Sequence, residues 1–189
     1  WSETQPPEDP ATMSDQTTPA NAPTDSALQS EEEIFEQKAV RLAKRDRLNA
    51  EATDLGGGAY PVSVPVTHTI GQVRAQFGHL EEVPDTASGV AGRVVFQRNT
   101  GKLCFASLQS GDGTRIQAMV SLAEVGEESL ARYKELVDLG DHIFVRGEVI
   151  SSRRGELSIM VSEWQIAAKA VVPLPNLHSE LNEETRVRQ

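Results

Sequence analysis

Hydrophobic and polar residues alternate with a period of two along five stretches of this chain, a pattern typical of β-strands with one buried face. The predicted strands cover residues 89–98, 103–108, 115–120, 141–150 and 156–161, and residues 164–166 extend the fifth. Glycine-containing turns are expected at residues 99–102, 110–113 and 151–155. The pattern therefore predicts five strands, most of them joined by short turns.

A period near 3.6 residues predicts helices outside these strands. Residues 31–52 contain no Gly or Pro, and Ser30 with Glu33 forms a capping-box pattern at their start. A shorter helix is expected at residues 70–77 with Thr69 as its cap, and another at residues 127–138. Three strands, a helix and two strands is the order of a five-stranded OB-fold barrel. We therefore predict a mainly β fold with flanking helices, in which this barrel follows an N-terminal helix.

Composition and pattern together divide the chain into four parts. Residues 1–30 hold five acidic residues, five of the ten prolines and no Lys or Arg, so we expect a disordered tail there. The N-terminal helix and an extended linker are expected in residues 31–85, the barrel in residues 86–172 and a connector in residues 173–189.

Charge and composition limit the classes of function that are expected of this chain. The 189 residues carry a net charge of −10, and no long apolar run or secretory signal is present, which predicts a cytoplasmic protein that does not bind membranes. The stretches 86–126 and 142–172 together carry eight basic and five acidic residues, so the overall acidity does not exclude a polyanionic partner. The single cysteine, Cys104, falls on the expected inner face of the second strand, which indicates a buried thiol rather than a nucleophile. We expect no metal site, no cofactor and no catalytic residue in this chain.

OB barrels commonly bind single-stranded nucleic acid on their second and third strands, where aromatic rings stack on bases. Phe105 is such a platform if it faces outward and a core residue if it does not, and alternation alone leaves both open. Gln117 faces outward on the third strand, where its amide either reads a base edge or is an ordinary surface group. Glu156 and Ser158 face outward on the fifth strand, and the carboxylate either accepts from a base or keeps the sheet edge soluble.

Basic side chains occur at the hairpin tips and on the first helix. If the hairpin residues gather at one end of the barrel they form a rim that attracts phosphates, and otherwise they are solvated charges: Arg98, Lys102, Arg153 and Arg154. The helix residues lie on or beside one stripe, which is either a ridge that follows phosphates or the solvated face of a docking helix: Lys38, Arg41, Lys44 and Arg45.

Four segments resemble the anticodon-binding region of bacterial class II lysyl-tRNA synthetases. They are RLAKRDRLNAEATDLGGGAYPVSVPVTHTI (41–70), GRVVFQRNTGKLCFASLQSGDGTRIQAM (92–119), LGDHIFVRGEVISSRRGELSIMV (139–161) and PLPNLHSELNEETRVRQ (173–189). The wording RNTGKLCFA and VISSRRGELS is most similar to actinobacterial members. The resemblance extends from about residue 33 to residue 189, nearly all of the chain that we expect to be ordered.

The resemblance implies roles for individual residues. Phe105 would stack on the central anticodon base of tRNA(Lys), Gln117 and Arg98 would contact that base and its neighbours, and Glu156 or a nearby residue of the fifth strand would meet the first anticodon position. The family often has two consecutive arginines where this chain has Gln97 and Arg98, which leaves open which of the two makes that contact.

The resemblance also implies a homodimeric parent enzyme that attaches lysine to tRNA(Lys). Its catalytic domain, which uses ATP and Mg²⁺, would follow the last segment and is absent from these 189 residues, so we expect this chain alone to be inactive. Two other function classes remain open: a stand-alone OB module that binds single-stranded nucleic acid without sequence preference, and a fragment whose basic helix binds an acidic protein. The leading helix, the linker and the charged final segment favour anticodon recognition over both.

Overall fold

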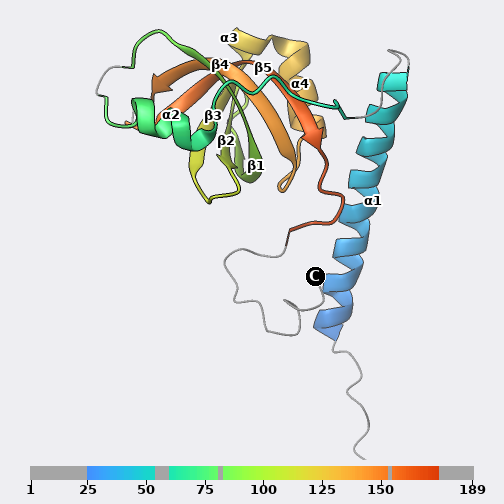
Figure 1. Cartoon of the computed structure of the whole chain (residues 1–189). Helices are drawn as coiled ribbons and strands as arrows, with labels where there is room; N and C mark the ends of the chain where they lie inside the picture. Colours follow the sequence, from blue (N-terminus) through green and yellow to red (C-terminus); the bar gives the residue numbers. More distant parts are fainter. Residues whose placement is uncertain (1–24, 54–59, 81–82, 153–154, 175–189) are drawn as a thin grey trace, which may run out of the picture.

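The computed structural model describes residues 25–53, 60–80, 83–152 and 155–174, and five strands in these ranges close into a barrel (Figure 1). The order around the barrel is β1-β2-β3-β5-β4, and neighbours are antiparallel except β3 and β5, which are parallel. The strands are β1 (Ala87–Asn99), β2 (Leu103–Gln109), β3 (Arg115–Ser121), β4 (His142–Ser151) and β5 (Leu157–Ala168). This arrangement confirms the predicted OB-fold barrel, including the extension of the fifth strand beyond residue 161.

In the described ranges, four helices flank the barrel: α1 (Asp25–Thr53), α2 (Ile70–Phe77), α3 (Leu122–Val125) and α4 (Glu127–Leu136). The predicted Thr69 cap of α2 is confirmed, because the Gln72 backbone N–H donates to Thr69 Oγ1 over 3.1 Å. The Thr69 backbone N–H in turn donates to Gln72 Oε1 over 2.8 Å, which completes a capping box that was not predicted. The single turn of α3, capped by Ser121, was not predicted.

The start of α1 differs from the prediction. The helix begins at Asp25, so Ser30 lies inside it and does not cap it. The residues before Ser30 include Ala27, Leu28 and Gln29, which favour a helix and let it extend into the predicted tail. Residues 1–24 of that tail lie outside the described residues, as do residues 175–189 of the predicted connector.

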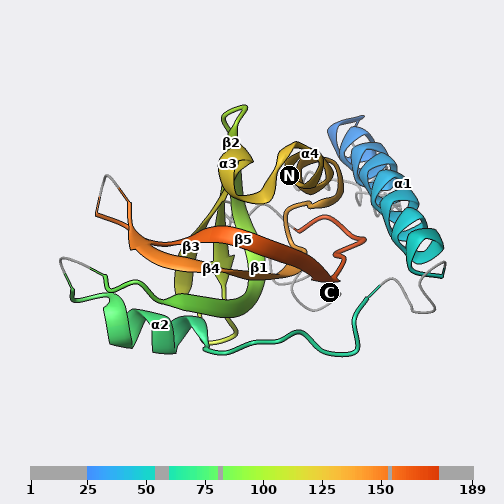
Figure 2. The same cartoon turned by 90° about the horizontal axis from the view of Figure 1, so that it is seen from above.

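The core lies inside the barrel and continues under two of the helices. Cys104, Ala106 and Leu108 on β2 are buried, as their alternation predicted. Figure 2 shows α2 and α4 on opposite sides of the barrel, and each helix contributes buried residues to the core: Ile70, Val73 and Phe77 from α2, and Leu130, Tyr133 and Leu136 from α4.

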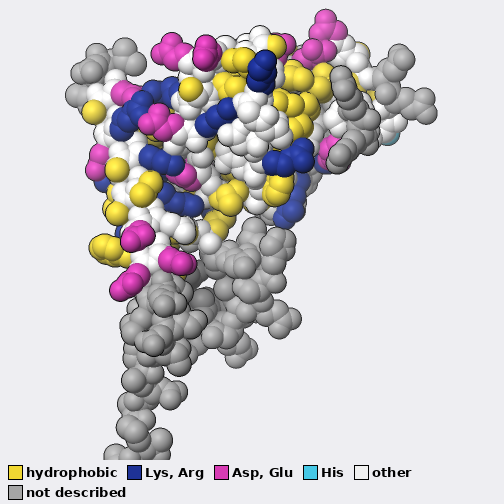
Figure 3. Space-filling model, turned by 180° about the vertical axis from the view of Figure 1, so that it is seen from behind, with side chains coloured by type: hydrophobic (Ala, Val, Ile, Leu, Met, Phe, Trp, Pro, Cys, Tyr) yellow, Lys and Arg dark blue, Asp and Glu magenta, His cyan; other side chains and the backbone are white. Residues whose placement is uncertain are grey.

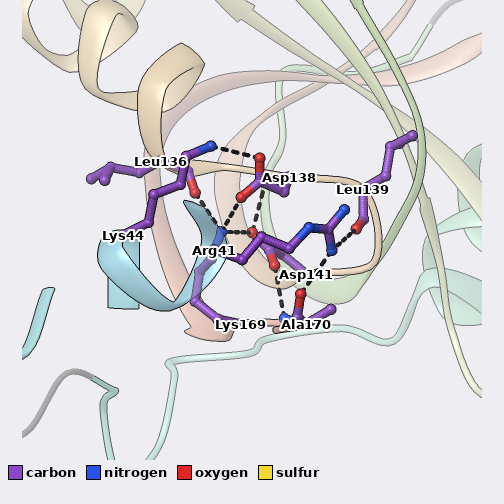
Figure 4. Close-up of polar contacts among 8 residues, drawn as sticks. All are labelled: Arg41, Lys44, Leu136, Asp138, Leu139, Asp141, Lys169 and Ala170. Carbon is purple, nitrogen blue, oxygen red and sulfur yellow. Dashed lines mark hydrogen bonds and ion pairs between the residues drawn. The ribbon is translucent and has the colours of Figure 1, made fainter. Parts of the chain in front are cut away.

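A cluster of charged side chains joins α1 to the barrel (Figure 4). Arg41 is buried, and its Nη1 donates to the Leu139 and Ala170 carbonyls over 2.9 and 2.7 Å. Lys44 pairs with Asp138 at 2.6 Å. Lys169, whose side chain is fully buried, donates to the Leu136 carbonyl and to the carboxylates of Asp138 and Asp141, each over 2.6 Å. Buried charges persist only when they are paired. The cluster therefore fixes α1 against the segment that precedes β4 and against the segment that follows β5.

This cluster makes the stability of the protein sensitive to acid. Burial raises the pKa of Asp138, but the hydrogen bonds and charges of Lys169 and Lys44 outweigh burial and hold that pKa below its ordinary value. The carboxylate therefore contributes stability that is fully present above its ordinary pKa of 3.8 and is lost as the pH falls through the lower native value. We expect the free energy of unfolding, measured in urea between about pH 2 and 6, to fall more steeply toward acid in the parent than in Asp138→Asn. Asp46→Asn, on the exposed side of α1, should keep the steep dependence, and equal slopes in all three proteins would contradict the assignment.

Candidate nucleic-acid interface

The outward face of β1, β2 and β3 gathers the residues that the sequence singled out. Phe105 lies opposite Arg98 on one side and Met119 on the other, and Gln117 lies opposite Ser107. Facing residues of paired strands share one side of a sheet, so these five side chains form a continuous surface. We call this surface the β1–β3 face.

Phe105 lies on this surface and does not belong to the core. It is half-buried, while both of its neighbours on β2 are fully buried. The guanidinium carbon of Arg98 lies 4.9 Å from the centroid of its ring, which is the distance of a cation–π contact. Of the two alternatives that the alternation left open, the structure shows the outward-facing aromatic ring and not the core residue.

The strand register also separates Gln97 from Arg98. Arg98 pairs with Phe105, whereas Gln97 pairs with Ala106, whose side chain points into the barrel. Successive side chains of a strand point to opposite faces, so Arg98 and not Gln97 shares the side of Phe105. A β-bulge between Val94 and Phe96 sets this register.

Gln117 is held by a chain of hydrogen bonds that crosses to β5. Its Nε2 donates to Ser158 Oγ over 2.9 Å, and Ser158 Oγ donates in turn to the Glu156 carbonyl over 3.0 Å. The Glu156 carboxylate is exposed and pairs with Arg74 of α2 at 2.9 Å. The structure thus brings Gln117 and Ser158 together, while the Glu156 side chain is directed to Arg74.

The basic residues on α1 divide into two groups. Arg41 and Lys44 are held in the contact between α1 and the barrel, so the predicted phosphate-tracking ridge must be corrected: these two side chains are occupied within the chain. Arg45 pairs with the adjacent Asp46 at 2.7 Å, and Lys38 is exposed.

Two of the four residues of the predicted basic rim at the hairpin tips lie in the described ranges. Arg98 and Lys102 are exposed at the β1–β2 turn, whereas Arg153 and Arg154 lie outside the described residues. From behind, Lys and Arg side chains lie on the barrel as well as along α1, with hydrophobic side chains exposed among them (Figure 3). Basic charge is therefore distributed over the surface of an acidic chain.

Three residues near this surface were not among the candidates that the sequence pattern indicated. Phe96 is 56% exposed and pairs with Ser107, diagonally beside Phe105, and its place in the alternation of the first strand was the available signal. Arg115 lies on the side of Gln117 and donates to Gln109 over 2.9 Å. Arg74 of α2 donates to the Arg115 carbonyl, and nothing in the sequence pattern indicated this contact.

The Cys104 thiol and the arrangement of His, Cys, Asp and Glu bear on two other kinds of site, nucleophilic and metal-binding. Burial raises the pKa of the Cys104 thiol, which keeps it protonated and unreactive. No group of three or more His, Cys, Asp or Glu in the described ranges is placed to hold a metal ion. None of the described helices is long and apolar enough to cross a membrane.

Comparison with known proteins agrees with this geometry. The sequence profile of the family described as "OB-fold nucleic acid binding domain", of the tRNA anticodon type, matches residues 89–167. The lysine–tRNA ligase of Mycolicibacterium gilvum is 58% identical over 164 residues, which cover 85% of this chain and 32% of that protein. The lysine–tRNA ligase of Kineococcus radiotolerans is 57% identical over 160 residues, covering 84% of this chain and 31% of the relative. Lysine–tRNA ligase 1 of Mycobacterium tuberculosis is 53% identical over 168 residues, covering 87% and 32%.

The chain thus spans about a third of the length of the curated relatives that it matches. The family match includes all but the first two residues of β1 and the last residue of β5, and it agrees with the resemblance seen in the sequence. Residues 89–167 thus match OB-fold nucleic acid binding domains of the tRNA anticodon type, and the chain is similar to the corresponding third of lysine–tRNA ligases.

Proposed function

We propose that this chain recognises the anticodon of tRNA(Lys) through the β1–β3 face, as the anticodon-binding part of a lysine–tRNA ligase. The observation that carries the proposal is that Phe105 and Gln117 are diagonal neighbours on the outward face of β2 and β3. A half-exposed ring beside an amide can stack on one base and hydrogen-bond to its edge.

Charge supports the same role. Arg98 lies against the Phe105 ring and remains exposed, so its guanidinium can meet a phosphate or a base stacked nearby. Lys102 at the adjacent turn and Lys38 on α1 are exposed and supply further positive charge for the RNA backbone. Glu156 holds Arg74 with one carboxylate oxygen, and its other oxygen is the candidate for the first anticodon position.

We assign aminoacylation, with its ATP, Mg²⁺ and lysine sites, to the two thirds of the relatives that this chain does not match. The parent enzyme would work in the cytoplasm as a homodimer. Within such an enzyme the barrel supplies recognition, and the chemistry takes place elsewhere.

Phe105→Ala tests this function directly. The substitution should weaken binding of an RNA anticodon stem-loop with the sequence UUU by about 1–3 kcal/mol, the usual contribution of base–aromatic stacking. Because Phe105 lies outside the core, the loss in unfolding free energy should stay below the ~3–5 kcal/mol expected for a core phenylalanine. Affinity by fluorescence anisotropy and stability by urea unfolding are measured on the same preparations.

Phe35→Ala is the matched control, since Phe35 is 73% exposed on α1, away from the β1–β3 face. It should bind the stem-loop as tightly as the parent. A folded Phe105→Ala protein with parental affinity would refute the proposed site. Equal affinity of the parent for stem-loops of any anticodon would favour instead a module without sequence preference.

A further inference from the structure

Ser158 is a buried residue that hydrogen-bonds to the Gln117 amide from the side of the protein interior. It faces Gln117 across the parallel pair of β3 and β5, and it is fully buried although Gln117 itself is half-exposed. Its Oγ makes two hydrogen bonds, accepting from Gln117 Nε2 over 2.9 Å and donating to the Glu156 carbonyl over 3.0 Å. Ser158 therefore contacts the candidate base-reading side chain from the protein side.

The single proton of the hydroxyl determines the direction of this contact. A serine hydroxyl has one O–H to donate, and the Glu156 carbonyl, which is an acceptor only, takes it. Toward Gln117 the oxygen can then only accept, so the amide nitrogen must face Ser158 and Gln117 Oε1 must face away. In the described residues Oε1 has no hydrogen-bonding partner, which leaves it, with the second N–H of the amide, for a ligand.

The direction of the amide matters because two pyrimidines present opposite patterns. Uracil offers an N–H donor at position 3 and a carbonyl acceptor at position 4, whereas cytosine offers an acceptor at position 3 and an amino donor at position 4. A free amide exchanges its donor and its acceptor by a half-turn and could pair with either base. An amide held in one direction accepts only one of them, as long as stacking fixes the position of the base.

We propose that Ser158 is a positioning residue that fixes the direction of the Gln117 amide and thereby makes the central position selective for uridine over cytidine. The inference rests on the proposed function and adds to it the residue that sets this specificity. Gln117 supplies the contact with the base, and the hydroxyl behind it supplies the discrimination. Only one of the two pyrimidines then finds both of its hydrogen bonds without loss of the Gln117–Ser158 bond.

The test measures the affinity of the full chain for two RNA stem-loops that differ only in the central anticodon base, UUU and UCU. The parent should prefer UUU, and Ser158→Ala should lower the ratio of the two affinities by about three- to tenfold, the effect of one lost hydrogen bond. Ser158→Thr keeps the hydroxyl and should retain the parental ratio. The melting temperature of Ser158→Ala should change little, because the Glu156 carbonyl keeps its bond from the Ser152 N–H and the Gln117 amide can bond to water.

A double substitution separates positioning from a general structural role. In Gln117→Ala, which has no amide to orient, adding Ser158→Ala should leave the affinity ratio unchanged. A ratio that still changes in that background, or an equal loss of both affinities in Ser158→Ala, would overturn the inference. So would a parental ratio in Ser158→Ala. If the parent itself shows no preference for UUU, the proposed function fails, and this outcome is distinct from failure of the Ser158 inference alone.

Discussion

Lys169→Met should lower the free energy of unfolding by about 3–5 kcal/mol, because it leaves buried carboxylate charge without its partner. The Lys169 ammonium and the Asp141 carboxylate are both fully buried, and Asp138 accepts from the same ammonium. Methionine fills a similar volume, so the loss comes from the unpaired charges and from the free Leu136 carbonyl rather than from a cavity. Urea unfolding at pH 7 measures the effect. Asp138→Asn should lower the free energy of unfolding by less when it is added to Lys169→Met than when it is made in the parent.

Arg47→Met is the control for this prediction. Arg47 joins α1 to α4, pairing with Glu51 and Glu135, but its side chain is 46% exposed. Exposed ion pairs contribute little, so the loss should stay below about 1 kcal/mol. Equal losses in the two variants would show that burial of the Lys169 cluster carries no special weight.

Gly147→Ala should lower the free energy of unfolding by about 3 kcal/mol or more, which is the upper end of the range for overpacked interiors. Gly147 lies at a β-bulge between β4 and β5, and a Cβ atom there would lie 1.8 Å from the Met160 carbonyl oxygen and 2.7 Å from its carbon. These are backbone atoms of the neighbouring strand, so no side chain can move aside, and the pairing of β4 with β5 must open. The expected result is a strongly lowered melting temperature or failure to fold.

Gly111→Ala gives the matched comparison, since a Cβ atom at Gly111 meets nothing within 4 Å. The change in unfolding free energy should lie within about 0.5 kcal/mol of zero. A Gly147→Ala protein as stable as Gly111→Ala would mean that β5 can shift away from β4 at this bulge without loss.

Most of the barrel could be predicted from the sequence because strand signals are local. Alternation located all five strands, and the Thr69 cap was predicted from a threonine placed directly before a helical stretch. The start of α1 was misjudged because Ser30 and Glu33 match a capping box in sequence, although the helix begins five residues before Ser30. A capping motif marks a helix start only where the chain before it leaves the helical conformation.

Long-range contacts could not be predicted in this way. Arg41 donates hydrogen bonds to Leu139 and Ala170, which are 98 and 129 residues away in sequence. The spacing of basic residues on the helix is the same whether that face contacts RNA or the barrel, so the sequence could not distinguish the two. Phe105 was ambiguous for a related reason, since an aromatic residue suits either face of a strand. The pairing with Arg98 resolved it. The direction of the Gln117 amide depends on one hydroxyl proton on another strand, which no sequence pattern encodes.

The parallel pairing of β3 with β5 has a consequence for synthesis of the protein. The barrel closes only when β5 joins β3, and β5 ends at Ala168, so a nascent chain that has already made β1, β2 and β3 exposes an open sheet edge. The partners of Arg41 and Lys44, at residues 138, 139 and 170, are also made late. At ordinary translation rates of about 5–20 residues per second, α1 and the first three strands wait for seconds before either contact can form. We therefore expect the ribosome-bound intermediate to be the state of this protein in which chaperones have most to protect.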